Sequence, residues 1–276
     1  MDDLTRGAKV YFELPFDLPD GMVTLKNLIT QSTVTLFVAT VLIMIAAYAV
    51  TRKITKRPGR VQVLVEKVIT MLYNLVEDTM GKHNARFAPY IGTLFLSSMV
   101  NTLLGMTNIL RSASADLSVT AAWALVTTGM VWYNNIRNFG FKAWLKGFAE
   151  PIVVMTPMNI VSEIASPLSL AFRHFGNVAG GSVLTGLIYF ALSAASSMLF
   201  SWLPFGLSEI PFLTAGIPAF LSIYFDLFSG FVQAFVFSLL TMVYVAGACP
   251  PPEEIPEDRR AILEARAAKK AKANKN

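Results

Sequence analysis

The chain has 276 residues, of which 54% are hydrophobic and 15% are charged, and its formal net charge is +5. Ordinary soluble proteins carry about 25% charged residues. Together with recurrent uncharged runs of bilayer length, this composition excludes a typical soluble domain and predicts a polytopic membrane protein. The basic residues border the apolar runs or lie in the C-terminal tail, which indicates membrane orientation rather than a nucleic-acid partner.

The sequence lacks the motifs that several kinds of chemistry require. The single cysteine, Cys249, allows no internal disulfide and no cysteine-based metal cluster. The sequence has no P-loop and no glycine-rich dinucleotide motif, so we expect no nucleotide chemistry on this chain and no cofactor or metal. The polar, acidic start also predicts no cleavable signal peptide.

The first half of the chain predicts three membrane spans and one interfacial helix. Residues 1–27 form a polar extracytoplasmic segment, and five cations between Arg52 and Arg60 place the following loop in the cytoplasm. Residues 61–80 put apolar side chains on one helical face and polar ones on the other, which is typical of a helix lying along the membrane surface. The predicted spans are 28–50, 89–110 and a marginal 117–133, followed by a cytoplasmic loop at 134–157.

The second half contains two apolar segments, about 159–202 and 211–248, that exceed the length needed to cross about 30 Å of hydrocarbon. Each is either a helix pair or one tilted helix, and the absence of proline between Pro167 and Pro204 favours single helices. The expected fold is therefore all-α, with about five transmembrane helices, the last two long and strongly tilted. We expect a membrane domain at 28–249, with its core at 159–248, and a basic cytoplasmic tail at 250–276.

Arg173 is the only fixed charge between Ile164 and Ser208. A guanidinium at membrane depth costs about 2.5–3.5 kcal/mol on insertion scales, and it cannot escape this cost by losing its proton. Such a residue is retained where it faces protein or a water cavity, so Arg173 is the leading candidate for a functional residue.

Polar and small residues recur at helical spacing around Arg173 and again in the last apolar segment. They are Ser162, Ser166, Ser169, Asn177 and Gly180 in the first case and Ser222, Asp226, Ser229, Gly230 and Gln233 in the second. Helix packing explains serines and glycines equally well. Asp226 is either a salt-bridge partner of Arg173 or a carboxylate on an aqueous path.

Two further residues have open interpretations. His174 points about 100° away from Arg173 and is a candidate proton relay, although the neighbouring cation opposes its protonation. Glu163 lies near the cytoplasmic end of its helix, where it either lines an access path or favours the helix start.

The chain resembles the a subunit of F-type ATP synthase over roughly residues 25–248. The resemblance rests on the arginine motif Pro167–Asn177 and on Phe231–Tyr244 in the last helix. Weaker support comes from Pro89–Phe95, Asn101–Gly105 and Pro157–Asn159. His174 departs from the family, which usually has an aliphatic residue there.

The resemblance implies an ion-channel stator in a bacterial inner membrane, with the N-terminus outside and the C-terminus cytoplasmic. It implies as partners a ring of c proteolipids, the peripheral-stalk b subunits and the F1 sector, with lipid around them. Arg173 would be the essential arginine that separates two ion half-channels, without ATP chemistry on this chain. By the resemblance, the ion-pathway residues would be Asn177, Asp226, Gln233 and Ser182, to which the residues themselves add Glu163 and His174 as candidates.

Two other functions compete with this interpretation. A secondary transporter predicts inverted repeats and broken helices, and the sequence shows neither. A membrane scaffold leaves Arg173 and Asp226 unexplained. The sequence leaves open whether the ion is H⁺ or Na⁺.

Overall fold

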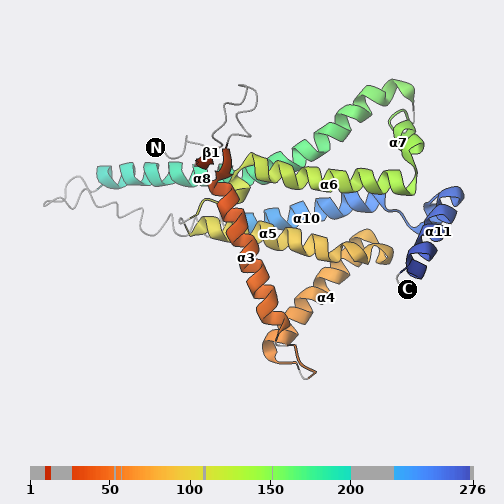
Figure 1. Ribbon diagram of the computed structural model, residues 1–276. Helices are drawn as coiled ribbons and strands as arrows, with labels where there is room; N and C mark the ends of the chain where they lie inside the picture. The colour runs from red at the N-terminus through yellow and green to blue at the C-terminus, as the bar shows by residue number, and fades with distance from the viewer. Residues whose placement is uncertain are drawn as a thin grey trace. The chain divides into compact units, whose positions relative to one another are not determined.

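The computed structural model describes residues 10–13, 27–52, 54–56, 58–107, 110–150, 152–199 and 227–273. Helices dominate this part of the chain (Figure 1). Four of its helical segments are long and apolar enough to cross a membrane: Gln31–Thr51, Lys82–Met106, Val153–Met198 and Ser229–Ala248. The predicted class, a helical polytopic membrane protein, is therefore confirmed.

The chain divides into two compact units, each built from three separate stretches. The first comprises Met1–Ile54, Leu94–Thr120 and Ala171–Phe237, and the second comprises Thr55–Thr93, Ala121–Leu170 and Ser238–Asn276.

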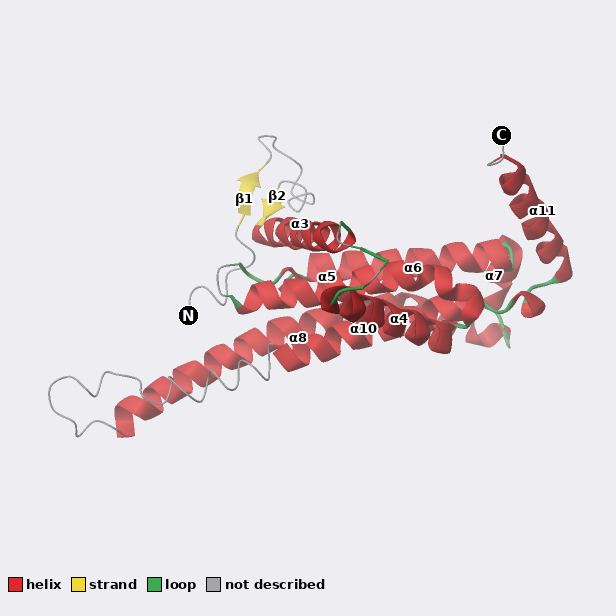
Figure 2. Cartoon of the chain, turned by 90° about the horizontal axis from the view of Figure 1, so that it is seen from below, coloured by secondary structure: helices red, strands yellow, loops and turns green. Residues whose placement is uncertain are grey.

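In the first unit, a short hairpin precedes the first long helix. Strands β1 (Val10–Glu13) and β2 (Asn27–Thr30) pair antiparallel, and α3 (Gln31–Thr51) follows directly, as Figure 2 shows. Thr30 caps α3 by accepting a hydrogen bond from the Thr33 amide at 3.4 Å. The first helix thus begins at residue 31 rather than 28, because the preceding residues are committed to strand pairing.

In the same unit, α3 also contacts the turn η3 (Ala113–Ala115). The hydroxyl of Thr35 donates to the Arg111 carbonyl at 2.9 Å. Helix α5 (Ala88–Met106) covers most of the predicted second span but ends before residue 110.

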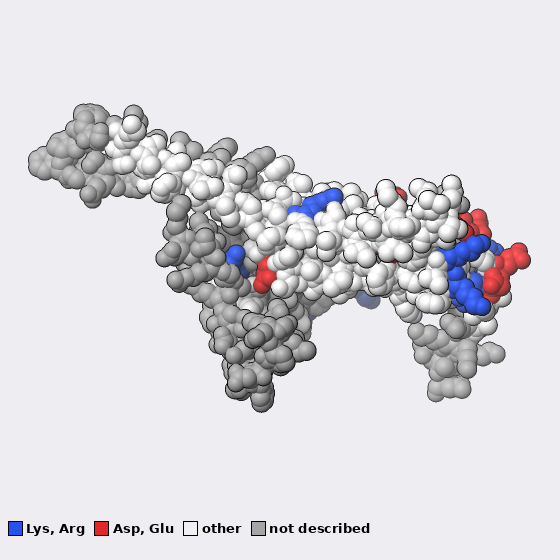
Figure 3. All heavy atoms as spheres, turned by 90° about the horizontal axis from the view of Figure 1, so that it is seen from above, with Lys and Arg blue, Asp and Glu red and all other residues white. Residues whose placement is uncertain are grey.

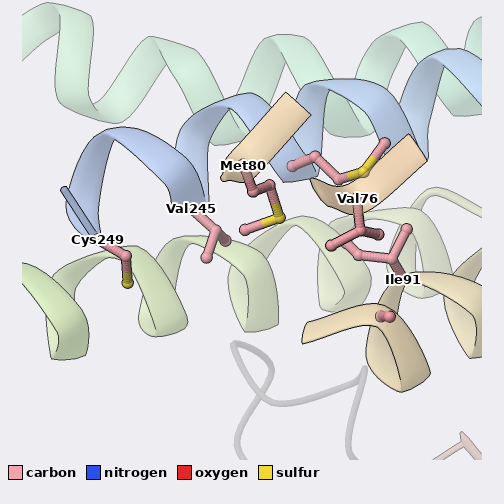
Figure 4. Packing of buried hydrophobic residues seen from close by; sticks show 7 residues of the cluster. Val76, Met80, Ile91, Val245 and Cys249 are labelled. Carbon is pink, nitrogen blue, oxygen red and sulfur yellow. The ribbon is translucent and has the colours of Figure 1, made fainter. Parts of the chain in front are cut away.

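The second unit has a core formed by α4 (Arg60–Met80), the start of α5 and the end of α10 (Ser229–Ala248). Its buried members are Val76, Met80, Ala88, Ile91, Met242, Val245 and Cys249 (Figure 4). The side-chain amide of Asn84 donates to the carbonyls of Met80 and Cys249, at 2.9 and 2.8 Å. The predicted amphipathic helix at 61–80 is thus a helix, and its C-terminal half packs against two others.

Helix α6 (Leu117–Asn138) is the predicted marginal span, extended to 22 residues. It is less apolar than the four helices above because it carries polar residues such as Thr127 and Asn134, both of which are buried. The predicted loop at 134–157 contains the end of α6, the short helix α7 (Phe141–Gly147) and the turn η4 (Val153–Met155).

Helix α8 (Thr156–Leu199) is continuous over 44 residues, with Pro167 inside it. The first long segment is therefore one helix, as predicted. In the second long segment, residues 211–226 lie outside the described residues, and α10 accounts for the rest.

The basic tail holds a helix that the sequence analysis did not predict. After the turn η7 (Pro252–Glu254), α11 (Glu257–Ala273) begins with two acidic residues, which suit the positive end of the helix dipole. Arg260 donates to the carbonyls of Glu253 and Ile255, at 2.9 and 3.2 Å, and so holds the start of α11 against the preceding turn.

Candidate functional site

Arg173 lies on the exposed side of α8. The neighbouring Leu170 and Ala171 are 2% and 3% exposed, whereas Arg173 and Phe172 are exposed. Within the described part of the chain, no residue forms a hydrogen bond or ion pair with the Arg173 guanidinium. In the space-filling view of Figure 3, uncharged surface covers most of the described part that is visible. The guanidinium is therefore free to meet a group outside this part of the chain.

The polar stripe that surrounds Arg173 is also open. Four of its members are exposed, namely Ser162, Ser169, Asn177 and Gly180, and Ser166 is half-buried. Because these residues recur every three or four positions, they share one face of α8. Apart from the bond between Asn177 and α10, the other described helices do not cover that face, so packing among them does not account for most of the stripe.

Asn177 lies one turn after Arg173 and connects α8 to α10. Its side-chain amide donates to the Gln233 carbonyl oxygen at 2.5 Å. Gln233 is only 4% exposed, and its own amide nitrogen has no hydrogen-bond partner within the described structure. This pair joins an exposed amide of α8 to a buried amide of α10, one helical turn after Arg173.

His174 points into the protein rather than along the exposed stripe. It is fully buried, and its Nε2 shares a hydrogen bond with the Ser98 hydroxyl of α5 at 3.2 Å. Its ring meets the Phe237 ring of α10 edge to face, with centroids 5.2 Å apart. Three helices therefore meet at this imidazole.

Helices α5 and α10 approach closely beside this junction. A Cβ atom at Gly230 would overlap the Thr102 methyl group, and Phe95 and Phe231 make an edge-to-face contact at 5.7 Å. The glycine is needed because the two backbones leave no room for a side chain there.

An open cavity of about 670 Å³ with a mixed polar and apolar lining lies in the second unit, between the end of α6, α7 and the start of α8. Trp132 donates from its indole nitrogen to a carboxylate oxygen of Glu163, which lines the cavity. Other lining residues include Asn135, Trp144, Lys146, Phe148, Glu150, Asn159 and Ser162. Lys146 and Glu150 form an exposed ion pair at 3.8 Å, which is weakly stabilising at most.

The structure brings some of the predicted site residues together, and others lie outside its described part. Asn177 and Gln233 meet in the contact between α8 and α10, and Arg173 lies one turn before Asn177 on α8. Ser182 belongs to α8, but its side chain lies outside the described part, and Asp226 lies outside the described residues altogether.

The sequence analysis did not identify Ser98, Phe237 or Trp132 as part of any site. A partial signal existed for Ser98, since it lies three residues before Asn101 on the same helix and both are buried. Phe237 and Trp132 gave no signal, because an aromatic residue in a membrane helix normally indicates packing or an interface anchor.

The fold and the site define a polytopic helical membrane protein that presents an accessible arginine on a long apolar helix. The sequence profile of the family described as "ATP synthase A chain" matches residues 33–246. The chain belongs to this family, which is the membrane subunit a of ATP synthase.

Individual members of this family align with the chain over most of their lengths. The chain is 32% identical to "ATP synthase subunit a, sodium ion specific" of Propionigenium modestum, covering 89% of this chain and 86% of that protein. It is 29% identical to the Moorella thermoacetica subunit a over 79% and 90% of the two chains, and 30% identical to that of Bacillus subtilis over 76% and 87%.

Proposed function

We propose that this chain is the stator ion-channel subunit of a bacterial rotary F-type ATP synthase. It forms two ion half-channels against a rotating ring of carboxylate-bearing proteolipids and couples H⁺ or Na⁺ flow to ATP synthesis or hydrolysis. ATP chemistry takes place on other subunits. The observation that carries this proposal is the exposed Arg173, which has no ion-pair partner among the described residues, on a 44-residue apolar helix in a member of this family.

The permanent charge of Arg173 gives a simple electrostatic gate. An ion that enters one half-channel neutralises a ring carboxylate, and the neutral site can then rotate into lipid. When that site reaches the stator, Arg173 favours the ionised carboxylate and expels the ion into the second half-channel. The same charge repels cations that would pass directly between the half-channels. Each monovalent charge crossing about 100 mV supplies about 2.3 kcal/mol.

The exposure of Arg173 suits this cycle. A buried, tightly paired arginine and carboxylate would form a trap, since breaking such a pair costs about 3–5 kcal/mol. An accessible guanidinium keeps its contact with a passing carboxylate hydrated and short-lived. Asn177 and Gln233, which hydrogen-bond at 2.5 Å, supply neutral amides beside it that can hold water or the ring side chain without adding charge.

Different residues line the two half-channels, one open to the cytoplasm and one open to the outside. Glu163 and the cavity of about 670 Å³ supply polar surface for the cytoplasmic path. Asp226 and Ser182 are assigned to the outer path by their positions in the family's pattern. The ring, rather than this chain, holds the ion ligands and therefore selects H⁺ or Na⁺.

The proposed setting is a bacterial inner membrane crossed five times, with the N-terminus outside and the C-terminus in the cytoplasm. The segments 1–27, 28–249 and 250–276 are then extracytoplasmic, membrane-embedded and cytoplasmic. Besides the ring, the partners are the peripheral-stalk b subunits and the F1 sector. At 1.5 Å per residue α8 is about 66 Å long, about twice the hydrocarbon thickness, so it must tilt strongly to stay in lipid.

Proximity of position 173 to the ring tests this function. The whole complex is purified from membranes that carry Cys249→Ala with Arg173→Cys, and a second cysteine is placed beside the proteolipid carboxylate. We expect a proteolipid to co-purify and a disulfide to form between the two introduced thiols.

The matched control is Leu170→Cys in the same background, because Leu170 is on the buried side of α8 and only 2% exposed. It should give little cross-linking. Efficient cross-linking at position 170 and none at position 173, or purification without a proteolipid, would refute the proposed function.

A further inference from the structure

We propose that His174 is a positioning residue for Arg173, and that its buried imidazole fixes the rotation of α8 so that the guanidinium faces outward. The inference rests on the proposed function, in which Arg173 must face the ring. It assigns to His174 a fixed structural contact with α5 and α10 rather than a place in the ion path.

The rotation of α8 needs such a contact because apolar side chains do not set it. Leu168, Phe172 and Val183 are 56%, 49% and 45% exposed, so large apolar groups already face outward. In a bilayer, lipid tails accept apolar side chains as readily as protein does, and helix contacts depend on close packing and polar bonds. A helix of this kind can rotate at little cost unless polar contacts resist it, and His174 makes one of these contacts in addition to the bond between Asn177 and Gln233.

His174 supplies that contact in two directions. Its Nε2 shares a hydrogen bond with the Ser98 hydroxyl of α5 at 3.2 Å, and its ring lies edge to face against Phe237 of α10 at 5.2 Å. All three residues are at most 1% exposed. Rotation of α8 would break this buried hydrogen bond between Ser98 and His174, which is unfavourable in an apolar setting.

Helical geometry passes this restraint to the neighbouring arginine. Consecutive residues of an α-helix differ in direction by about 100°, so a histidine held against α5 and α10 turns the preceding residue, Arg173, away from them. The observed exposure of Arg173 agrees with this. Leu170 and Ala171, one turn earlier on the buried side, pack without polar bonds and reinforce the same rotation.

The packing predicts which replacements can substitute for the imidazole. Leucine fills similar space but cannot bond Ser98, whereas glutamine can place an amide near the position of Nε2 and keep the hydrogen bond. Ser98→Ala removes only the partner hydroxyl and is the mildest change, so it remains informative if a larger replacement hinders assembly.

The experiment measures disulfide formation between an introduced thiol at position 173 and one beside the ring carboxylate, in the purified complex with Cys249→Ala. We expect His174→Leu and Ser98→Ala each to lower the cross-linking rate about tenfold, the effect of a buried hydrogen bond worth about 1–2 kcal/mol. His174→Gln should stay near the parent rate. The double variant His174→Leu with Ser98→Ala should be no worse than His174→Leu alone, because the hydrogen bond between the two residues is already lost in His174→Leu.

The outcomes separate the two proposals. If the parent complex shows no cross-link at position 173, the proposed function fails. If the parent cross-links and His174→Leu, once assembled, cross-links at the same rate, His174 does not position Arg173 and this inference is overturned. Equal losses for the leucine and glutamine variants with no loss for Ser98→Ala would also overturn it, since the hydrogen bond would then be irrelevant.

Discussion

Asn177 of α8 donates a hydrogen bond to Gln233 of α10 at 2.5 Å, one helical turn after Arg173. The bond joins residues far apart in the sequence and leaves the Gln233 amide nitrogen without a partner in the described structure. The polar group one turn after the arginine is therefore held by contact between two helices rather than by α8 alone.

Breaking this bond should loosen the contact between α8 and α10. We expect Asn177→Ala and Gln233→Ala to be non-additive in thermal denaturation of the purified complex, with a coupling free energy of about 0.5–2 kcal/mol. As a control, Gln233→Ala should combine additively with Thr40→Ala, because Thr40 is exposed and bonds only the Leu36 carbonyl of its own helix. Strict additivity for the Asn177 pair would show that the bond contributes nothing.

Gly230 should tolerate no side chain. A Cβ atom there overlaps Thr102, whose χ1 is restricted by β-branching and whose hydroxyl bonds the Ser98 carbonyl at 3.0 Å. Gly230→Ala should therefore destabilise by about 1–3 kcal/mol, measured by thermal denaturation. Gly247→Ala is the matched control on the same helix, since nothing lies within 4 Å of its Cβ position; it should be neutral or stabilising. Equal effects of the two changes would contradict the close approach of α5 and α10.

Cys249 should resist modification in the folded protein. Its thiol is 2% exposed, and burial raises its pKa despite the opposing influence of Arg86. Since the thiolate is the reactive form, maleimide labelling should be slow near neutral pH and should accelerate only at higher pH or on unfolding. Glu254→Cys in a Cys249→Ala background provides the exposed control and should react readily. Rapid labelling of native Cys249 would contradict the packing of the second unit.

The cavity beside Glu163 should admit water from the cytoplasmic side. Ser162 lines it and is exposed, so Ser162→Cys in a Cys249→Ala background should react with a membrane-impermeant maleimide in inside-out vesicles. Right-side-out vesicles should show little reaction, and the buried Leu170→Cys control should react from neither side. Labelling from the outer side alone would reverse the proposed topology.

Much of the architecture could be predicted from sequence because membrane helices depend on composition and length. The long run around Arg173 lacks a proline between Pro167 and Pro204, and the structure shows one helix over Thr156–Leu199. The start of α3 was misplaced because strand pairing between Val10–Glu13 and Asn27–Thr30 is a tertiary contact that apolar composition does not report. The helix in the tail was missed for a different reason: its alanine-rich, charged sequence favours a helix without an apolar face.

The site was only partly predictable. An arginine in an apolar run is conspicuous because of its cost, and its neighbours Asn177 and Gln233 follow from the family motif. Ser98 and Phe237 lie far from His174 in sequence and are ordinary residues for a membrane helix, so only the packing reveals their role. The exposure of Arg173 is likewise a property of the packing that the sequence does not report.

ATP synthesis driven by an imposed ion gradient in vesicles with Arg173→Ala tests the central claim most directly. The comparison variant is Arg137→Ala, which removes a cation from the last turn of α6, and both complexes must contain normal amounts of this chain and of the ring. We expect Arg173→Ala to abolish coupled synthesis, while Arg137→Ala retains most of it. Synthesis at the parent rate by an assembled Arg173→Ala complex would contradict the account.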